Sequence, residues 1–290
     1  MKNEQLSLML FPFDVDILYH HMTLSECFAL AKNAGISLVD VMNVPKESIP
    51  VCLDAMKKTG IKVQCYIGSI SFFSTGEQEI TEAFQNHLRA AERLAAKLLM
   101  LVPVNVQKDE AVCARLGKAG VRQRLVRCFS EAVSMARNSG IKVCFETTPQ
   151  DYTCLSGAED CLWILNQVPE LGLIYDTANM LPHGDDPLRY YEALKDHILH
   201  THLKDVMLSE PGDQPAYEKT WDGKAMRCCV SGEGVIPLKD IMTHMVQDGY
   251  SGTFALEYCH PEKYPADLQL HTRQLEKHMA FWNDNTDSTF

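Results

Sequence analysis

Four short apolar segments in the second half of the chain each end in a side chain that binds divalent metal ions. Their last residues are Glu146, Asp176, His202 and Glu257. Each segment follows a helical pattern, which is typical of a buried parallel strand. A charged group at the end of such a strand is costly unless something pairs with it. Three carboxylates and one imidazole at four consecutive strand ends suit a single Mn²⁺, Mg²⁺, Co²⁺ or Zn²⁺ ion.

Taken singly, these residues have ordinary alternative explanations. A glutamate at a strand end more often pairs with a lysine, and a single histidine in an apolar run is more often a core residue. His200 and His202 share one strand face, so we expect only His202, nearer the strand's end, to reach an ion. The metal prediction therefore depends on all four groups meeting at one end of one barrel.

A repeated order of helix, glycine and short β-branched-rich run organises the chain. It occurs at Gly35, Gly60, Gly140 and Gly249, and glycine after a helix is a C-cap signal. We expect strands at about 6–11, 36–42, 62–67, 98–102, 142–146, 171–176, 198–203 and 253–257. We expect helices at about 23–34, 47–59, 77–96, 118–139, 157–167, 186–196, 237–248 and 266–282. Strands and helices that alternate in this way predict an α/β fold, a (β/α)8 TIM barrel.

The barrel is expected to be a single domain over residues 1–290. An open doubly wound sheet is disfavoured, because no glycine-rich phosphate turn follows the first strand. The stretch of about 207–232 is rich in Pro, Gly, Asp and Ser, and we expect a long irregular loop there. That loop would leave the barrel face where active sites lie. Residues 283–290 are expected to form a frayed tail.

Composition limits the partners of the protein. A formal charge of -11 disfavours nucleic acids and anionic membranes, which bind clustered Lys and Arg. The chain does not open with a signal-peptide pattern, and no apolar stretch reaches the ~20 residues that span a bilayer. The eleven cysteines include no Cys-x-x-Cys pair. We expect reduced, mostly buried thiols in a cytoplasmic protein.

The same strand ends also carry recognisable motifs. They are Phe145-Glu146, Tyr175-Asp176-Thr177-Ala178-Asn179-Met180, His202-Leu203-Lys204-Asp205, Gly232-Glu233-Gly234 and Leu256-Glu257-Tyr258. With these motifs the chain resembles the xylose isomerase-like TIM-barrel superfamily, the sugar-phosphate isomerase/epimerase family. That group also includes ketose 3-epimerases, inosose dehydratases, hydroxypyruvate isomerases and abasic-site endonucleases.

The resemblance implies that Glu146, Asp176, His202 and Glu257 hold one divalent ion, with Mn²⁺ expected and Co²⁺, Mg²⁺ or Zn²⁺ as alternatives. It also implies that Glu146 and Glu257 are catalytic and move the proton on the carbon next to a carbonyl. The chemistry is reasonable, since a metal stabilises an enediolate oxygen as a Lewis acid. Two carboxylates on opposite faces of a planar intermediate can remove and return a proton.

Two departures separate this chain from the ketose 3-epimerases. Asn179 stands where they carry a histidine, and Tyr152 stands where they carry a second glutamate. The zinc endonucleases need that same histidine and an Asp-x-His pair, whose positions are Met226 and Cys228 here. We therefore reject the nuclease interpretation, in agreement with the acidic charge.

Four other residues are predicted to bind substrate: Lys204, Asn179, Arg227 and Tyr66. Each has an alternative explanation. Lys204 could pair with Asp205 or Asp176, Arg227 could be a solvated charge, and Asn179 could cap a turn. The aromatic and histidine residues within 11–21 could line a sugar pocket or pack a loop.

The sequence thus predicts a metal-dependent isomerase or epimerase that acts on a small sugar-like molecule. A lyase with the same site chemistry, such as an inosose-type dehydratase or a C-glycoside-cleaving subunit, is the first alternative. A non-catalytic barrel that binds a sugar or a partner is the second. A homo-oligomer is expected by family analogy alone.

Overall fold

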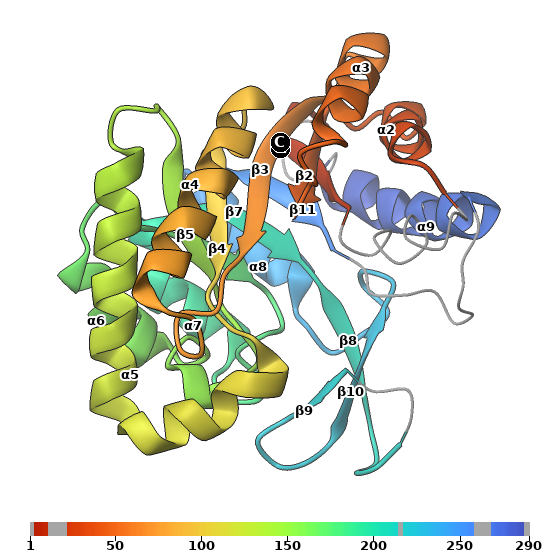
Figure 1. The fold of residues 1–290 in the computed structure, drawn as a ribbon. Helices are drawn as coiled ribbons and strands as arrows, with labels where there is room; N and C mark the ends of the chain where they lie inside the picture. The colour runs from red at the N-terminus through yellow and green to blue at the C-terminus, as the bar shows by residue number, and fades with distance from the viewer. Residues whose placement is uncertain (1–2, 11–21, 214–216, 258–267, 287–290) are drawn as a thin grey trace.

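The computed structural model describes residues 3–10, 22–213, 217–257 and 268–286. Eight parallel strands close into a barrel in the order β1-β11-β7-β6-β5-β4-β3-β2 (Figure 1). The strands are β1 (Leu6–Met9), β2 (Leu38–Met42), β3 (Lys62–Ser69), β4 (Leu98–Val102), β5 (Lys142–Glu146), β6 (Gly172–Asp176), β7 (Ile198–Leu203) and β11 (Thr253–Leu256). The predicted TIM barrel is confirmed.

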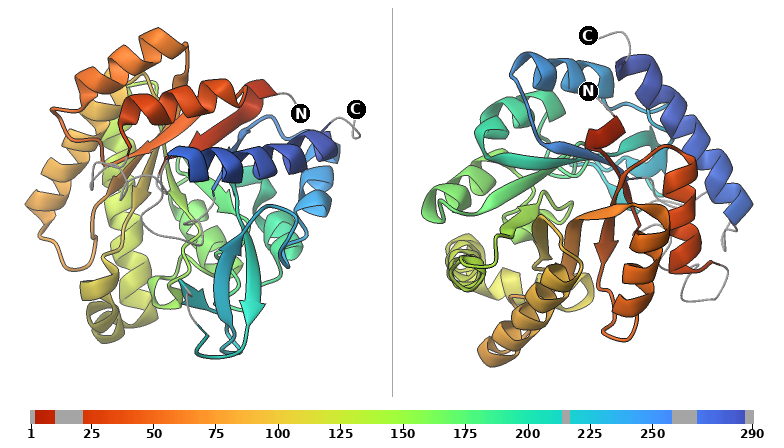
Figure 2. Two further views of the ribbon diagram at one scale, coloured as in Figure 1. Left: turned by 90° about the vertical axis from the view of Figure 1, so that its right-hand side faces the viewer. Right: turned by 90° about the horizontal axis from the view of Figure 1, so that it is seen from above.

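Helices cover the outside of the barrel, as two further views show (Figure 2). They are α2 (Leu24–Asn33), α3 (Ile49–Thr59), α4 (Glu77–Arg93), α5 (Val106–Ala136), α6 (Ala158–Gln167), α7 (Pro187–Leu194), α8 (Leu238–Gln247) and α9 (Leu268–Thr286). The start of α2 lies where the capping-box pattern in the sequence indicates it, because Thr23 and Glu26 form reciprocal hydrogen bonds there. Helix α5 bends at Gly117, whose φ of 66° interrupts the helix, and the predicted helix covers only the part beyond that bend.

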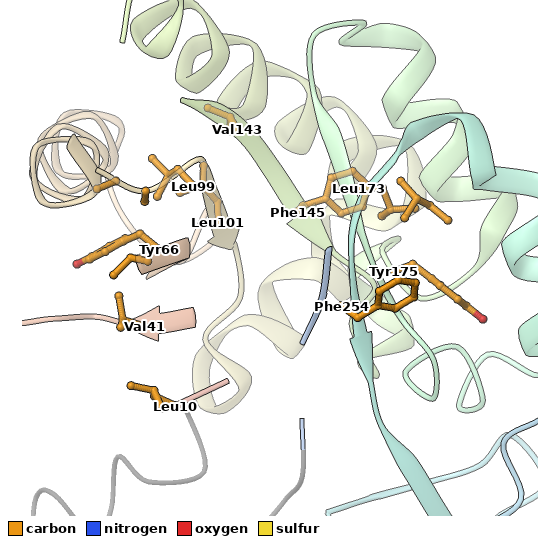
Figure 3. Close-up of a cluster of buried hydrophobic side chains, with 14 of the residues drawn as sticks. Leu10, Val41, Tyr66, Leu99, Leu101, Val143, Phe145, Leu173, Tyr175 and Phe254 are labelled. Atoms are coloured by element: carbon orange, nitrogen blue, oxygen red, sulfur yellow. The ribbon is translucent and has the colours of Figure 1, made fainter. Parts of the chain in front are cut away.

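Side chains alternate between two apolar regions along each strand. One set fills the barrel interior: Met9, Cys65, Ile67, Leu98, Met100, Cys144, Ile174 and Ala255. The other set packs between the strands and the helices, and includes Phe145, Tyr175 and Phe254 (Figure 3). The interior also holds buried polar groups, and these position the site.

Parts of the expected irregular loop after β7 form a three-stranded antiparallel sheet. Its strands are β8 (Asp205–Ser209), β9 (Glu218–Lys219) and β10 (Ala225–Cys229), in the order β8-β10-β9. The turn-forming residues misled the prediction, because the strands between them are short. The sheet extends beyond one end of the barrel (Figure 2). We call it the mouth sheet.

Two smaller predictions also need correction. Helix α9 continues to Thr286 instead of fraying at residue 283, because Trp282 is fully buried and Thr286 Oγ1 donates to the Trp282 carbonyl at 2.9 Å. Residues 287–290 lie outside the described part. Among the described residues nine cysteines are free thiols, but Cys228 is disulfide-bonded, so the expectation that every thiol is reduced is wrong there. No helix within the described ranges is both long and apolar enough to cross a bilayer.

Candidate metal centre

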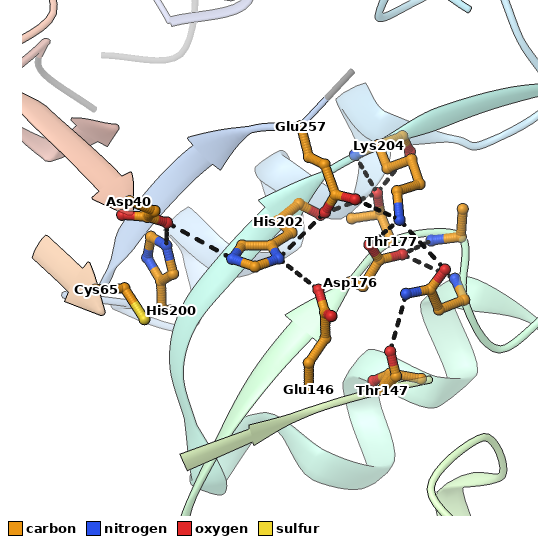
Figure 4. Close-up of polar contacts among 12 residues, drawn as sticks. Asp40, Cys65, Glu146, Thr147, Asp176, Thr177, His200, His202, Lys204 and Glu257 are labelled. Atoms are coloured by element: carbon orange, nitrogen blue, oxygen red, sulfur yellow. Dashed lines mark hydrogen bonds and ion pairs between the residues drawn. The ribbon is translucent and has the colours of Figure 1, made fainter. Parts of the chain in front are cut away.

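The four predicted ligands meet at one end of the barrel interior. Glu146 and Asp176 end β5 and β6, His202 lies near the end of β7, and Glu257 directly follows β11. One ligand atom from each lies within 4.8 Å of the ligand atoms of the others (Figure 4). Asp176 and His202 are fully buried, while the side chain of Glu146 keeps 13% of its surface exposed. The prediction that these strand ends converge is correct in geometry.

The imidazole of His202 lies between two carboxylates. Its Nδ1 contacts Glu146 Oε1 and lies 3.2 Å from Glu257 Oε2. Asp176 is held from behind, since its Oδ1 accepts hydrogen bonds from the backbone N–H groups of Ala178 and Asn179, both at 2.8 Å. Its second oxygen therefore faces the centre.

Lys204, the residue directly after β7, enters the same centre. Its Nζ lies 2.8 Å from Asp176 Oδ2 and 2.7 Å from Glu257 Oε1. It also donates to Asn179 Oδ1 at 3.3 Å, and the Asn179 amide donates to the Thr147 carbonyl at 2.9 Å. Asn179 therefore fixes the lysine here, and Lys204 pairs with Asp176 and not with Asp205.

The buried charges perturb one another strongly. Burial raises the pKa of the Asp176 carboxyl to about 7, and Lys204 opposes this shift. Burial also acts to raise the pKa of Glu257, but Lys204 and His202 together lower it to about 2. Burial disfavours the charged form of His202, yet the surrounding carboxylates, first of all Glu146, raise its pKa well above the usual value.

These residues fit a divalent ion on two observations. Asp176 Oδ2 and Glu257 Oε2 are buried without an aligned hydrogen bond, although charged groups lie nearby. Three carboxylates face Lys204 and a protonated His202, which leaves one net negative charge, and two remain once His202 loses its proton to bind an ion. A divalent cation would balance that charge, and three carboxylate oxygens with one imidazole nitrogen are a suitable ligand set.

The family model for xylose isomerase-like TIM barrels matches residues 28–278. This chain belongs to that family. It is 22% identical to the inosose dehydratase of Lacticaseibacillus casei over 200 residues, which are 64% of this chain and 66% of the dehydratase. It is 27% identical to the fructoselysine 3-epimerase of Escherichia coli O157:H7 over 164 residues, 54% of this chain and 52% of that protein.

Other matches are more limited in what they show. The uncharacterized protein YihM of Escherichia coli (strain K12) is 29% identical over 82 residues, 28% of this chain and 22% of YihM. The chain thus spans between about a fifth and two thirds of these curated relatives. A solved structure of the IOLI protein with a bound zinc atom matches with a TM-score of 0.73 at 18% identity, covering 99% of both chains. That likeness shows the shared barrel fold.

Two family motifs meet beside the metal centre through Asp205. Its Oδ2 accepts the N–H groups of Gly232 at 2.8 Å and Gly234 at 3.0 Å, and its Oδ1 accepts that of Ile236 at 3.1 Å. A Cβ on Gly234 would lie 2.2 Å from Asp205 Oδ1. The His-x-Lys-Asp motif therefore anchors the Gly-Glu-Gly segment, and the glycine is required by that close approach.

A second buried polar group lies deeper in the barrel interior, and sequence reasoning missed its carboxylate. Asp40 of β2 accepts a hydrogen bond from Ser7 Oγ at 2.7 Å and contacts His200 Nε2 at 2.7 Å. His200 therefore stays below the mouth, as its earlier position on the strand predicts. The missed signal was a charged residue between Val39 and Val41, the same criterion that found the four ligands.

Tyr217, which precedes β9 in the mouth sheet, was also missed. Its ring centroid lies 5.7 Å from Lys204 Nζ, within the range of a cation–π contact. Burial raises the pKa of its hydroxyl, with Lys204 acting against that shift. No local sequence pattern marks this residue, because the folding of the mouth sheet brings it back over the centre.

Two predicted substrate-binding residues lie elsewhere. Tyr66 points outward from β3 into the apolar layer with Leu99 (Figure 3), and its hydroxyl lies 3.4 Å from His87 Nδ1 of α4. Arg227 is exposed on β10, where its guanidinium lies 3.8 Å from the sulfur of Met207. The prediction for Tyr66 is wrong, and the one for Arg227 stays a prediction. The aromatic cluster predicted within 11–21 lies outside the described residues.

Proposed function

We propose that this protein is a divalent-metal-dependent enzyme that transfers a proton on the carbon next to a carbonyl, as an isomerase or epimerase. Its substrate would be a sugar or another small polyhydroxylated carbonyl compound. One observation carries the proposal. Glu146 and Glu257 converge on His202, in a buried group whose negative charges outnumber its positive charges. Among the relatives, an epimerase and a dehydratase of polyhydroxylated compounds support the substrate class.

The metal, when bound, would polarise the carbonyl and stabilise negative charge on its oxygen. Glu146 is the stronger candidate for the base, because its side chain keeps 13% of its surface exposed whereas Glu257 is ion-paired to Lys204. Glu257 is ionised at neutral pH, since its pKa is lowered to about 2, and can accept a proton from the other side. The Lys204 ammonium supplies a positive charge to a substrate oxygen.

The ligand set favours Mn²⁺, with Co²⁺, Mg²⁺ and Zn²⁺ as alternatives. Three of the four donors are carboxylate oxygens, which suit Mn²⁺ and Mg²⁺ better than the nitrogen- and sulfur-rich sites typical of zinc. A homo-oligomer and a cytoplasmic location stay predictions.

A lyase of the dehydratase type is the second candidate, because the dehydratase match covers more of this chain than the epimerase match. The first step is the same proton abstraction by a glutamate. The neighbouring carbon–oxygen bond would then break, and the Lys204 ammonium would protonate the departing hydroxide to water. The two reactions are distinguished by the mass of the product, which is lower than that of the substrate by one water molecule only for the lyase.

The test measures bound metal and then proton–deuterium exchange into ketoses and keto-inositols. We expect exchange beside the carbonyl that falls by about 10²- to 10⁴-fold in Glu146→Gln and in Glu257→Gln. Glu47→Gln, at an exposed glutamate, is the matched control. Metal binding without exchange into any substrate of the panel would contradict proton-transfer chemistry. Unchanged activity in both glutamine variants, with ligand binding retained, would support the non-catalytic alternative.

A further inference from the structure

The buried carboxylate of Asp40 lies beneath the metal centre and faces one of its ligands. Asp40 Oδ2 lies 3.6 Å from His202 Nε2 and 2.7 Å from His200 Nε2 (Figure 4). All three side chains are fully buried. The carboxylate therefore belongs to the barrel interior, yet it is within reach of the imidazole at the mouth.

The two nitrogens of His202 face opposite surroundings. Nδ1 faces Glu146 and Glu257, so it is the ligand atom of the proposed centre. Nε2 is buried without a hydrogen-bond partner, and the carboxylate oxygen that faces it is Asp40 Oδ2, 3.6 Å away. When Nδ1 gives its lone pair to a cation, the ring proton of the neutral imidazole must sit on Nε2. That proton then needs an acceptor.

We propose that Asp40 is a positioning residue that accepts the Nε2 proton of His202 and so keeps Nδ1 unprotonated and aimed at the ion. The inference rests on the proposed metal site. Carboxylates that hold a metal-binding histidine in this way fix its tautomer and its orientation.

Asp40 is itself fixed well enough for this role. Ser7 Oγ donates to its Oδ1 at 2.7 Å, and His200 Nε2 contacts its Oδ2 at 2.7 Å. His200 Nδ1 is in turn held by the carbonyl of Thr253 at 2.9 Å. The assembly ties together β1, β2, β7 and β11, so the carboxylate cannot turn away without breaking several contacts.

The test is the metal affinity of Asp40→Asn, measured by competition between the protein and a chelator for Mn²⁺ or Co²⁺. We expect about 10- to 100-fold weaker binding, together with a changed visible absorption spectrum of the Co²⁺ form. Ser7→Ala is the matched control, because it removes the hydrogen bond to the other oxygen of the same carboxylate. Its affinity should stay within about threefold of the wild type, although its stability falls. Equal affinity of Asp40→Asn and wild type, or an equal loss in Ser7→Ala, would overturn the proposal.

If Asp40→Asn does not fold, a measurement on the wild-type protein still tests the proposal. With Zn²⁺ bound, long-range ¹H–¹⁵N correlation spectra should show the proton of His202 on Nε2 and the metal on Nδ1. The opposite assignment would overturn the role of Asp40 while leaving the metal site intact. Failure of the wild type to bind any of these ions would instead refute the metal site, and the inference with it.

Discussion

The barrel interior holds two groups of buried carboxylates and imidazoles that differ in how well their atoms are satisfied. In the deeper group, both oxygens of Asp40 and both nitrogens of His200 have partners at 2.6–2.9 Å. In the group at the mouth, Asp176 Oδ2 and Glu257 Oε2 lack aligned hydrogen bonds. Two groups of similar composition therefore differ in how completely their polar atoms are hydrogen-bonded.

This difference in hydrogen bonding suggests that one group stabilises the fold and the other binds a ligand. A buried polar atom without a hydrogen bond costs about 1–3 kcal/mol, whereas a well-satisfied buried pair holds the fold together. The deeper group, centred on Asp40, has the character of a structural support. The mouth group retains unsatisfied atoms, and such groups concentrate at sites that bind something else.

The sharpest test makes the same substitution in each group. Asp40→Asn should destabilise the protein by about 3 kcal/mol, because His200 and Ser7 lose an ionised partner in the interior. Asp176→Asn, in protein without added metal, should cost less, about 1–2 kcal/mol, because Lys204 keeps its ion pair with Glu257 and the lost oxygen Oδ2 had no aligned hydrogen bond. Urea unfolding of both variants at pH 7.5 measures the two free energies. Equal losses would mean that the two groups do not differ in kind.

A buried histidine outside both groups should make the stability of the protein depend on pH. His278 of α9 lies against Ser231, whose hydroxyl is 2.9 Å from its Nδ1, and burial lowers its pKa to about 4. The unfolded chain binds the proton more readily, so stability is fully present above pH 6.5 and falls as the pH drops toward 4. The loss should reach about 3 kcal/mol and be absent in His278→Asn. Parallel stability curves for variant and wild type would contradict this account.

The sequence predicted the elements well because each carries its own local signal. Periodic apolar runs and glycine punctuation placed the barrel strands, and the cost of burying charge identified Glu146, Asp176, His202 and Glu257. The direction of a side chain was harder to predict. Tyr66 follows the inward-facing Cys65, so strand alternation turns it outward, but this parity is known only once the register is known.

Residues that depend on long-range folding escaped prediction for a different reason. Asp40 was missed because only strand ends were searched for charge. Tyr217 was missed because nothing local says which residues of the mouth sheet lie over the metal centre. Contacts of Asp205 with Gly232 and Gly234 fix that sheet, and they join distant parts of the chain.

Metal addition should stabilise the protein through the mouth group alone. At a free Mn²⁺ concentration of 100 times the dissociation constant, the expected gain is about 2.7 kcal/mol. Asp176→Asn should lose most of this gain because it removes a ligand, whereas Asp186→Asn, at the exposed cap of α7, should keep it. Unfolding curves with and without the ion measure the effect. An equal gain in both variants would place the ion elsewhere.

The smallest expected effect is on substrate affinity and comes from Tyr217, whose ring lies over Lys204 of the mouth group. Tyr217 places its ring 5.7 Å from the Lys204 ammonium, and such a contact is worth about 0.5–1 kcal/mol where solvent is near. Tyr217→Phe keeps the aromatic face and should leave the KM of the proton-transfer reaction nearly unchanged, while Tyr217→Leu should raise it about two- to fivefold. The stability of both variants should stay close to that of the wild type, because the side chain lies in the mouth sheet and not in the barrel interior. A larger loss in Tyr217→Phe than in Tyr217→Leu would show that the hydroxyl, not the ring, meets the substrate.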